Sequence, residues 1–400
     1  IVSDRSASKL PSSGSVDFIL RMFNAEHSET LPKQFTLIAN PLSRSWQEGT
    51  GLDMDGYLDK TRDGDGSNWI NASNGTQWSS QGGDALQTTF SQIFDSGEED
   101  LEVNITSLVE SWINGSTPNY GLLIRLTGSQ ESQNRSFYTK RFFSRSSEHF
   151  FKRPIIEARW DSTSRDERNR FYVSSSLLSQ ADNTHSVYLY NYVRGQLKNI
   201  ANVGTGSIYV QVYTSASDGS LVTTIPSVVT GGYVSTGVYS ASFVLDTTSS
   251  IVYDRWFVSN TSYHTGTIRP LKYDSLESQI ESRKYISSLT NLKSSYSPAE
   301  TARIRMFVRQ KNWSPNIYTV ASVAIPNIII DNVYYKLLRL SDNSVIIDYG
   351  TGSLNHTRLS YDTSGNFFDF DFSMLEARYS YGFKFMFLID GNYEIGRAHV

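Results

Sequence analysis

Short alternations of apolar and polar residues run through most of the chain and predict β-strands. In such a segment successive side chains fall on opposite faces, so one face can pack while the other meets water. The clearest segments are 187–192, 207–213, 238–245, 303–309, 334–340 and 383–389. Because helical periodicity is sparse, the pattern predicts an all-β fold, a multidomain array of β-sandwiches or jelly rolls with one short helix in the first domain.

Turn signals separate the alternating segments at intervals of roughly ten residues. Glycines beside Asp, Ser or another glycine mark these positions and predict hairpins or loops. The signals are Asp218-Gly219, Gly231-Gly232, Gly350-Thr351-Gly352, Ser364-Gly365 and Asp390-Gly391. Their spacing favours antiparallel sandwiches over βαβ units.

One segment, 104–114, has helical spacing of its apolar residues. Asn104 or Thr106 is the candidate N-cap, and Gly115 is placed to end the helix. A weaker helical pattern covers 274–285. The apolar face of the stronger helix is formed by Ile105, Leu108, Val109 and Trp112.

Two polar stretches, 161–169 and 271–300, predict breaks between domains. The first is rich in charges and has the composition of a linker, and the second is rich in serine. The resulting division is a β-sandwich at 1–160, a second β-sandwich at 161–275, a linker at 276–296 and a third β domain, cut short, at 297–393.

The last seven residues, 394–400, read EIGRAHV and resemble the translation of a common sequencing adapter. The chain also begins with Ile1 rather than Met. We therefore expect an open reading frame from an environmental assembly that is cut at both ends. The heptad takes no part in the interpretation of fold or site.

Composition and charge exclude several classes of protein. The chain of 400 residues has 36 Lys and Arg against 40 Asp and Glu, a net charge of −4, which argues against a nucleic-acid-binding protein. It has no Cys, which excludes disulfide scaffolds, iron–sulfur clusters, thiolate zinc sites and a Cys nucleophile. No apolar run approaches the roughly 18 residues of a membrane span, so we expect no membrane insertion.

Sequence motifs of catalysis are missing as well. The chain contains no Gly-x-Ser-x-Gly elbow, no phosphate-binding Gly-x-x-x-x-Gly-Lys loop and no carboxylate pair in a glycosidase context. Its histidines form no pair with the spacing of metal ligands. We therefore predict that the protein is not an enzyme and that it needs no cofactor, with calcium as the one candidate ion.

The candidate calcium site is a cluster of four aspartates, Asp53, Asp55, Asp63 and Asp65. Asp63 and Asp65 alternate with glycine, as oxygen ligands do at the start of a calcium loop. The Glu that an EF-hand requires is replaced by Asn74, so the cluster is not an EF-hand. The alternative interpretation is a solvated acidic turn.

Tryptophans in the first domain raise a second binding hypothesis. Trp69 and Trp78 lie in segments rich in Gly, Ser and Asn, where an exposed ring can stack on a sugar. They are the candidate glycan-binding residues. Trp46 and Trp112 are expected to fill the core instead, and in the alternative interpretation all four rings do so.

The order of motifs in the first domain resembles a known module. It runs from Trp-Gln-Glu-Gly at 46–49 through Trp69, Trp78 and the helical segment to Asn-Tyr-Gly-Leu-Leu at 119–123. This order is similar to that of the DNRLRE-type β-sandwich of secreted, cell-surface and virion proteins. The resemblance covers about residues 15–160 and implies a jelly-roll-like module with one helix.

The rest of the chain resembles large structural proteins of marine contractile-tailed phages, or myoviruses. The resemblance rests on the segments 188–200, 231–237, 263–266, 300–303, 350–361 and 379–382. It implies a virion component of the tail, neck or capsid exterior. Other virion structural proteins are then the expected partners, and repeated copies imply a homo-oligomer.

Together these observations predict a non-enzymatic structural protein whose β domains act as rigid spacers and docking surfaces. One alternative is a secreted or surface-exposed adhesin, or a host-recognition fibre, that binds surface polysaccharide through its first domain. Another is a secreted glycan-degrading enzyme that carries the first module as an accessory. The enzyme would need an acid/base pair, which we do not find in residues 170–393.

Overall fold

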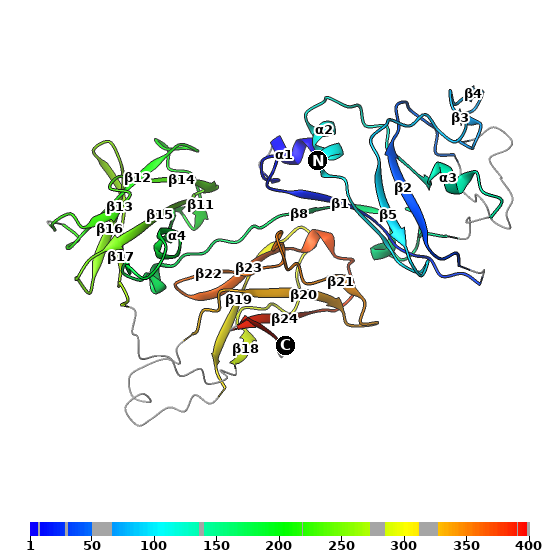
Figure 1. Cartoon of the computed structure of the whole chain (residues 1–400). Coiled ribbons are helices and arrows are strands. Elements are labelled where there is room, and N and C mark those ends of the chain that lie inside the picture. Colours follow the sequence, from blue (N-terminus) through cyan, green and yellow to red (C-terminus); the bar gives the residue numbers. More distant parts are fainter. Residues whose placement is uncertain are drawn as a thin grey trace. The chain divides into compact units, whose positions relative to one another are not determined.

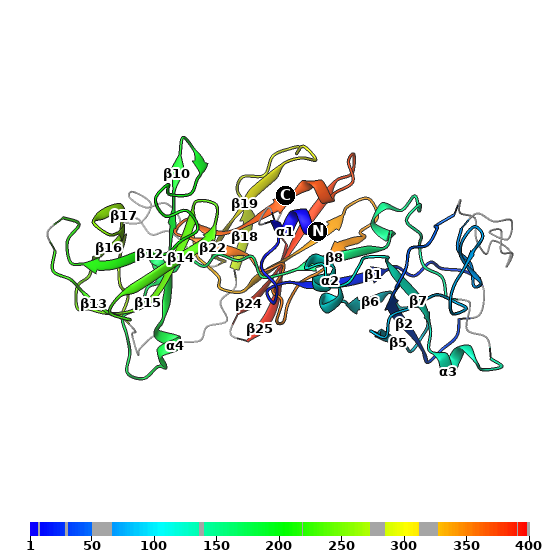
Figure 2. The same ribbon diagram turned by 90° about the horizontal axis from the view of Figure 1, so that it is seen from above.

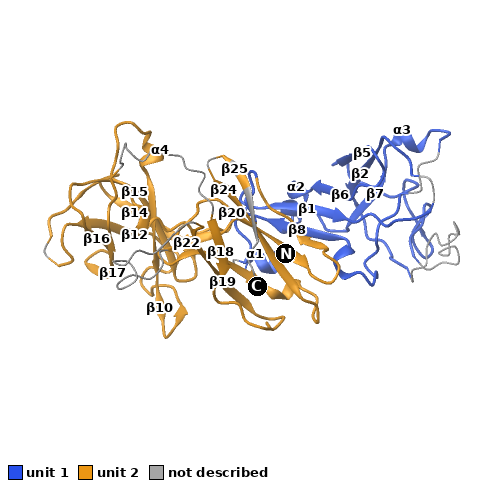
Figure 3. Ribbon diagram, turned by 90° about the horizontal axis from the view of Figure 1, so that it is seen from below, with its two compact units in different colours: residues 1–161, 352–356 blue, residues 162–351, 357–400 orange. Residues whose placement is uncertain are grey.

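The computed structural model describes residues 1–6, 9–28, 31–49, 66–135, 140–217, 219–272, 285–311, 327–389 and 391–397. Their regular secondary structure is mostly β-strand, which confirms the predicted all-β fold. The chain divides into two compact units (Figure 3). Unit 1 comprises Ile1–Asp161 with Gly352–His356, and unit 2 comprises Ser162–Thr351 with Thr357–Val400.

Unit 1 contains two three-stranded antiparallel sheets, with the strand orders β6–β1–β8 and β5–β2–β7, and a small β3–β4 hairpin (Figure 1 and Figure 2). The strands of the sheets are β1 (Asp17–Met22), β2 (Phe35–Pro41), β5 (Phe90–Phe94), β6 (Leu101–Asn104), β7 (Leu122–Leu126) and β8 (Ile155–Arg159). The hairpin is formed by β3 (Asn71–Ser73) and β4 (Thr76–Gln77).

The core of unit 1 is formed by side chains from both sheets. Phe18 and Leu20 of β1 are buried with Leu101 of β6. From the other sheet, Phe35 and Phe94 are cross-strand partners whose rings stack with centroids 5.1 Å apart. Unit 1 is therefore a small β-sandwich.

The predicted helix is confirmed as α2 (Thr106–Ile113). The N-cap prediction is wrong, because Ile105 occupies that position and makes no side-chain cap bond. Asn104 Oδ1 accepts a hydrogen bond of 3.0 Å from the Thr106 backbone N–H just before the helix. The Thr106 hydroxyl accepts instead from the backbone N–H of Phe18 at 2.8 Å, which ties the helix to β1. Gly115, with a φ of +78°, follows the helix end as expected.

The expectation of a single helix in the first domain is wrong. Unit 1 also contains α1 (Val2–Ser6), α3 (Gly128–Glu131) and the 3-10 turn η3 (Phe150–Lys152). Helices of four or five residues are too short to show a periodic apolar face, so no sequence pattern announces them.

Unit 2 begins with η4 (Arg168–Arg170) and α4 (Gln180–Asn183), followed by a seven-stranded sheet. The order is β13–β15–β14–β12–β16–β17 (Figure 2). Strand β9 also pairs with β15. The strands of this sheet are β9 (His185–Tyr190), β12 (Ile208–Tyr213), β13 (Thr223–Ile225), β14 (Val229–Ser235), β15 (Val238–Asp246), β16 (Val252–Val258) and β17 (Thr261–Ile268). A short hairpin joins β10 (Tyr192–Val193) to β11 (Gln196–Leu197).

The remainder of unit 2 is a sandwich of two four-stranded sheets around one core. One sheet has the order β18–β19–β23–β22 and the other β21–β20–β24–β25. The strands are β18 (Tyr285–Leu289), β19 (Thr301–Gln310), β20 (Val333–Arg339), β21 (Val345–Ile347), β22 (Ser360–Asp362), β23 (Gly365–Asp371), β24 (Tyr381–Ile389) and β25 (Asn392–Arg397). The turn η5 (Phe372–Met374) follows β23.

The six clearest strand predictions are confirmed by β9, β12, β15, β19, β20 and β24. The turn predicted at Gly231-Gly232 is wrong, since both residues lie inside β14. A Cβ atom on Gly231 would lie 2.8 Å from the Ser240 carbonyl oxygen and 3.2 Å from the Trp256 ring. Close packing therefore requires this glycine, and the turn itself lies at Gly237, whose φ is +74°.

The other turn signals have mixed outcomes. Ser364-Gly365 joins β22 to β23, and Gly391 lies between β24 and β25, as expected. Asp218 and Asp390 lie outside the described residues, and so does the weak helical pattern up to residue 284. Tyr285, the last residue of that pattern, is the first of β18.

The linker predicted at 276–296 is wrong for 285–289, because these residues form β18, paired with β19. Ser287 is buried there, and Tyr285 and Leu289 pack against the core. Two of the five residues of β18 are serines, so its sequence lacks the alternation of apolar and polar residues that predicts a strand. At the other end, β25 pairs with β24, so the backbone of 394–397 forms part of a hairpin.

Candidate functional site

Three loop segments around the tryptophans of unit 1 are joined by backbone hydrogen bonds. We call the segments 44–48, 67–84 and 119–121 the tryptophan loops. The Gln47 N–H donates to the Ala72 carbonyl at 2.9 Å, and the Ser67 N–H donates to the Gln47 carbonyl at 2.8 Å. The Trp46 indole N–H donates to the Tyr120 carbonyl at 2.9 Å. These bonds hold the three segments together as one surface element.

Trp69 is the most exposed indole in the tryptophan loops. Its side chain is 56% exposed. A Cβ atom on Gly82 would lie 2.8 Å from Cη2 and 2.9 Å from Cζ3 of Trp69, so the ring packs on the bare backbone of this glycine. Gly82 also has a φ of +87°, which favours glycine. The ring is thus exposed and yet held in place.

The exposure of the other three tryptophans differs in part from what the sequence predicts. Trp78 is half-buried, and its indole N–H donates to the Asn68 carbonyl at 2.9 Å. Trp112 packs against the core, as expected. Trp46 was expected in the core but is 41% exposed, because its hydrogen bond to the Tyr120 carbonyl holds it at the surface.

Asp84 organises the same loops by hydrogen bonding. Its carboxylate accepts from the Ser79 N–H at 3.0 Å and the Ser80 N–H at 2.8 Å. Arg44 Nη1 lies 3.6 Å from the carboxylate. The backbone hydrogen bond from Ser79, with the other bonds and Arg44, holds the pKa of Asp84 below its usual range. Asp84 is therefore ionised and holds the loop through its hydrogen bonds. A general acid must carry a proton, so Asp84 is not suited to that role.

The four candidate calcium ligands, Asp53, Asp55, Asp63 and Asp65, lie in 50–65, outside the described residues. Among the residues that the structure describes, no group of three or more His, Asp or Glu side chains is placed to hold a metal ion. No helix in the same residues has the length and apolarity of a membrane span.

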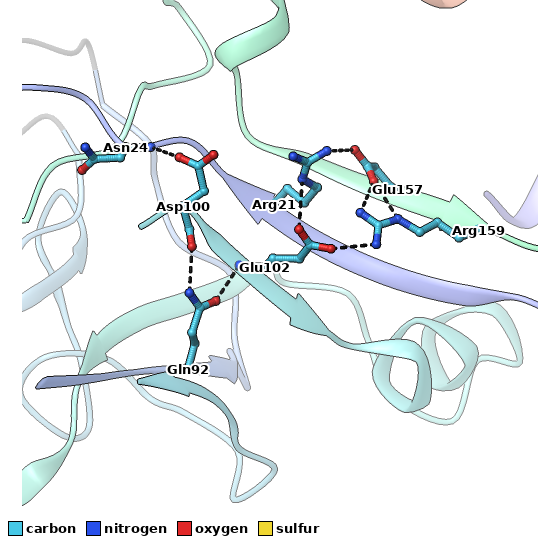
Figure 4. A network of polar contacts seen from close by, with 7 residues as sticks. All are labelled: Arg21, Asn24, Gln92, Asp100, Glu102, Glu157 and Arg159. Carbon is cyan, nitrogen blue, oxygen red and sulfur yellow. Dashed lines mark hydrogen bonds and ion pairs between the residues drawn. The ribbon is translucent and has the colours of Figure 1, made fainter. Parts of the chain in front are cut away.

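A network of charged residues covers one face of the β6–β1–β8 sheet of unit 1 (Figure 4). Arg21 Nη1 lies 2.6 Å from Glu157 Oε1. Arg159 bridges two carboxylates, with Nη2 2.7 Å from Glu157 Oε2 and Nη1 2.7 Å from Glu102 Oε1. The four side chains are between 16% and 46% exposed, so water reaches part of each of them.

Unit 2 contains a second ionic cluster, and this one is buried. Arg168 in η4 forms a two-pronged ion pair with Asp254 of β16, one prong of which is 2.8 Å long. Asp254 is fully buried and also accepts a hydrogen bond of 2.7 Å from the Trp256 indole. A Cβ atom on Gly266 would lie 2.6 Å from Asp254 Oδ1 and would also meet Arg168. Only glycine fits beside this pair.

Arg168 belongs to the segment 162–170, which we call the connector. The Arg168 backbone N–H donates a hydrogen bond of 3.2 Å to the Asp166 carboxylate. Asp166 is only 4% exposed, and burial raises its pKa to about 6, against the opposing effect of Arg168. A carboxyl group that titrates near neutrality therefore lies inside a structural contact.

The connector also binds the four-stranded sandwich of unit 2. Arg170 forms an ion pair with Asp331. The Asn169 side-chain amide donates to the Thr363 carbonyl at 2.9 Å, and the Ser164 N–H donates to the Ser360 hydroxyl at 3.0 Å. The connector thus contacts both the seven-stranded sheet and the sandwich that follows it.

Sequence reasoning missed this cluster because it interpreted 161–169 as a solvated linker. One signal was present in β16, where Val252, Asp254 and Trp256 share the inward-facing side of the strand. A charge in an apolar register requires a partner of opposite charge, since an unpaired buried charge is very costly. Arg168, 86 residues earlier, is that partner.

Comparisons with known proteins give little. No family model matches the chain, and no curated protein matches it significantly. Seven chains of solved structures match, among them trypsin-activated alpha-2-macroglobulin from Escherichia coli, at 10% identity over 96% of this chain and 22% of that chain, with a TM-score of 0.19. The native conformation of the E. coli protein matches at 10% identity over 96% and 20%, with a TM-score of 0.16. The chain spans about a fifth of these structures, and likeness at such scores carries no argument.

Proposed function

We propose that this chain is a non-enzymatic structural protein of a contractile-tailed phage virion, in which it serves as a rigid spacer and docking surface. The observation that carries the proposal is the connector of unit 2. A spacer must transmit force between its β domains, and a flexible hinge would not do so. Within unit 2 the connector is held to the seven-stranded sheet by the Arg168–Asp254 ion pair and to the four-stranded sandwich by the Arg170–Asp331 ion pair and the Asn169 hydrogen bond, so it joins these two β domains.

The buried part of the connector contact supports stiffness in particular. The Arg168–Asp254 pair has two parallel contacts, Nη1 to Oδ1 and Nη2 to Oδ2, which fix direction as well as distance. Breaking it leaves a charge in the core, so partial loosening is disfavoured. Each β domain also has its own core, which makes each a stiff body by itself.

The sequence resemblance to phage structural proteins supports the same proposal. Two of its segments, 231–237 and 263–266, contain glycines that pack on the buried cluster. Gly231 lies against Trp256, and Gly266 lies against Arg168 and Asp254. The resemblance therefore includes residues that build the rigid contact.

Proteomics of purified marine virions tests the proposal. We expect peptides of this chain at levels stoichiometric with other virion proteins, and the copy number then separates a capsid decoration from a neck or tail part. Absence from virions, with peptides in host-surface or secreted fractions instead, would contradict the phage assignment.

A second function, glycan binding through unit 1, is favoured by one observation, the exposed Trp69 ring fixed on Gly82. A rigid aromatic face binds sugar rings without losing conformational freedom. On an array of host polysaccharides we expect the intact chain to bind and Trp69→Ala to lose the signal. Trp78→Phe tests the second candidate ring, because it keeps an aromatic side chain but removes the hydrogen bond to the Asn68 carbonyl. Tyr192→Ala is the control, because it removes an exposed ring in unit 2. Unchanged binding by Trp69→Ala would reject this function.

A further inference from the structure

A cavity of about 500 Å³ opens in the four-stranded sandwich of unit 2. It is enclosed by the segment 292–298 after β18, the segment 372–380 after β23, and residues at the ends of β20 and β24. Sites for small molecules commonly measure roughly 300–1,000 Å³. The cavity is therefore large enough for one or two sugar rings.

Aromatic rings form much of its wall. Tyr296 stacks on Phe372 with ring centroids 4.0 Å apart and an interplanar angle of 9°. Tyr379 is 46% exposed, and the Arg339 guanidinium lies 4.9 Å from its ring centroid. Ser295 and Ser380 add hydroxyl groups to the lining. The electron-rich ring faces suit the C–H bonds of a sugar ring, while the hydroxyls suit its polar edge.

The charges around the cavity are paired with one exception. Arg339 is paired with Asp342 and Glu376, and Lys293 is paired with Glu300. Arg378 lines the cavity, is exposed, and has no ion pair within the described part of the chain. The site thus has one guanidinium whose charge is not already neutralised by a neighbour.

The backbone of Arg378 has an unusual conformation. Its φ is +73°, a region that residues other than glycine rarely adopt. Strain of this kind persists where the surrounding structure imposes it, and it is concentrated at binding sites. The charged residue is held at the cavity although glycine would fit the backbone better.

We propose that this cavity binds an acidic saccharide, a sugar of one or two rings that carries a carboxylate. The sugar rings lie against Tyr296 and Tyr379, and the carboxylate is bound by the Arg378 guanidinium. The planar guanidinium matches a carboxylate with two parallel hydrogen bonds, so it selects uronic acids over neutral sugars. The site is separate from the tryptophan loops and goes beyond the spacer function.

Isothermal titration calorimetry of the full chain tests the proposal, with digalacturonate as the acidic probe and cellobiose as the neutral one. We expect saturable binding of digalacturonate and binding of cellobiose that is at least tenfold weaker. Arg378→Gly removes the charge and relieves the backbone. It should raise the dissociation constant for digalacturonate roughly tenfold or more and leave that for cellobiose unchanged.

Matched variants separate the site from general effects. Arg194→Gly is the control for charge, because Arg194 is an exposed arginine with a φ of +53° in the β10–β11 hairpin. Tyr379→Ala should weaken binding of both sugars, and Tyr192→Ala is its control. No saturable binding, equal binding of both sugars, or no effect of Arg378→Gly would overturn the proposal. Loss of binding in Trp69→Ala would overturn it as well and assign the sugar to unit 1.

Discussion

The two ionic clusters of this chain use the same chemistry in opposite surroundings. In unit 1, Arg21, Arg159 and their carboxylates lie on a sheet face that water reaches (Figure 4). In unit 2, Asp254 is fully buried under Arg168. Exposed ion pairs contribute about 0–1 kcal/mol each, whereas breaking a buried pair costs about 3–5 kcal/mol. Access of water, more than the number of pairs, decides what each cluster contributes.

The sharpest test of this comparison is Arg168→Met. It leaves the Asp254 charge unpaired in the core, so we expect unit 2 to lose about 3–5 kcal/mol of unfolding free energy. Arg159→Met in unit 1 is the matched control and should cost under about 1 kcal/mol. Hydrogen exchange of β16 and β1 peptides, measured by mass spectrometry, reports each unit separately. Equal losses in the two variants would remove the distinction between the clusters.

The pH dependence of unit 2 sharpens the comparison through Asp166. Its pKa is raised from 3.8 to about 6 in the folded chain, so between these values the folded state holds a proton that the unfolded chain releases. The free energy of unfolding therefore falls as pH rises through this window, by at most about 3 kcal/mol. Urea unfolding from pH 4 to 7 measures the slope, and Asp166→Asn should flatten it. An equal slope in the variant would assign the pH dependence to other groups.

Gly266→Ala tests how closely the buried pair is packed. The added methyl group would meet Asp254 Oδ1 and the Arg168 side chain, which must then move apart. We expect a loss of about 1–3 kcal/mol, as for other overpacked cores. Gly232→Ala is the control, because a Cβ atom there meets nothing within 4 Å. Thermal unfolding of both variants measures the difference, and equal melting temperatures would contradict the close packing.

The smallest effect is expected from Glu102→Gln in unit 1. Glu102 is 46% exposed, and Arg159 keeps Glu157 as a second partner. We expect a loss of about 0.2–1 kcal/mol that disappears in 1 M salt, because salt screens exposed pairs. Unfolding of β1 peptides with and without salt measures it. A larger loss, or one that persists in salt, would mean that the network is shielded from water.

The sequence predicted those features that depend on neighbouring residues alone. Alternation of period two marks β12 and β19, and spacing of three and four marks α2, because each pattern is complete within one element. The same local signals misjudged Gly231, which is required by the Trp256 ring rather than by a turn. Its partner comes from another strand, and no local pattern records it.

The candidate sites were harder to predict for the same reason. Exposure of Trp69 was expected from its polar surroundings, but Gly82, which fixes the ring, belongs to another turn of the loop. Trp46 was assigned to the core because the Tyr120 carbonyl that holds it lies 74 residues away. The cavity at Arg378 joins segments that are far apart in the chain, so no sequence motif marks it.

The distant partners of the connector also determine when it can dock during synthesis. Arg168 cannot form its ion pair until Asp254, 86 residues later, has been synthesised. Asn169 cannot donate to the Thr363 carbonyl until 194 further residues have been added. At about 5–20 residues per second, a ribosome needs roughly 10–40 s to supply the second partner. Until Asp254 is synthesised, the segment lacks the ion pair that fixes Arg168 in the folded chain. Its dense charge, which resembles that of a linker, keeps it hydrated and unattractive to other chains until its partners emerge.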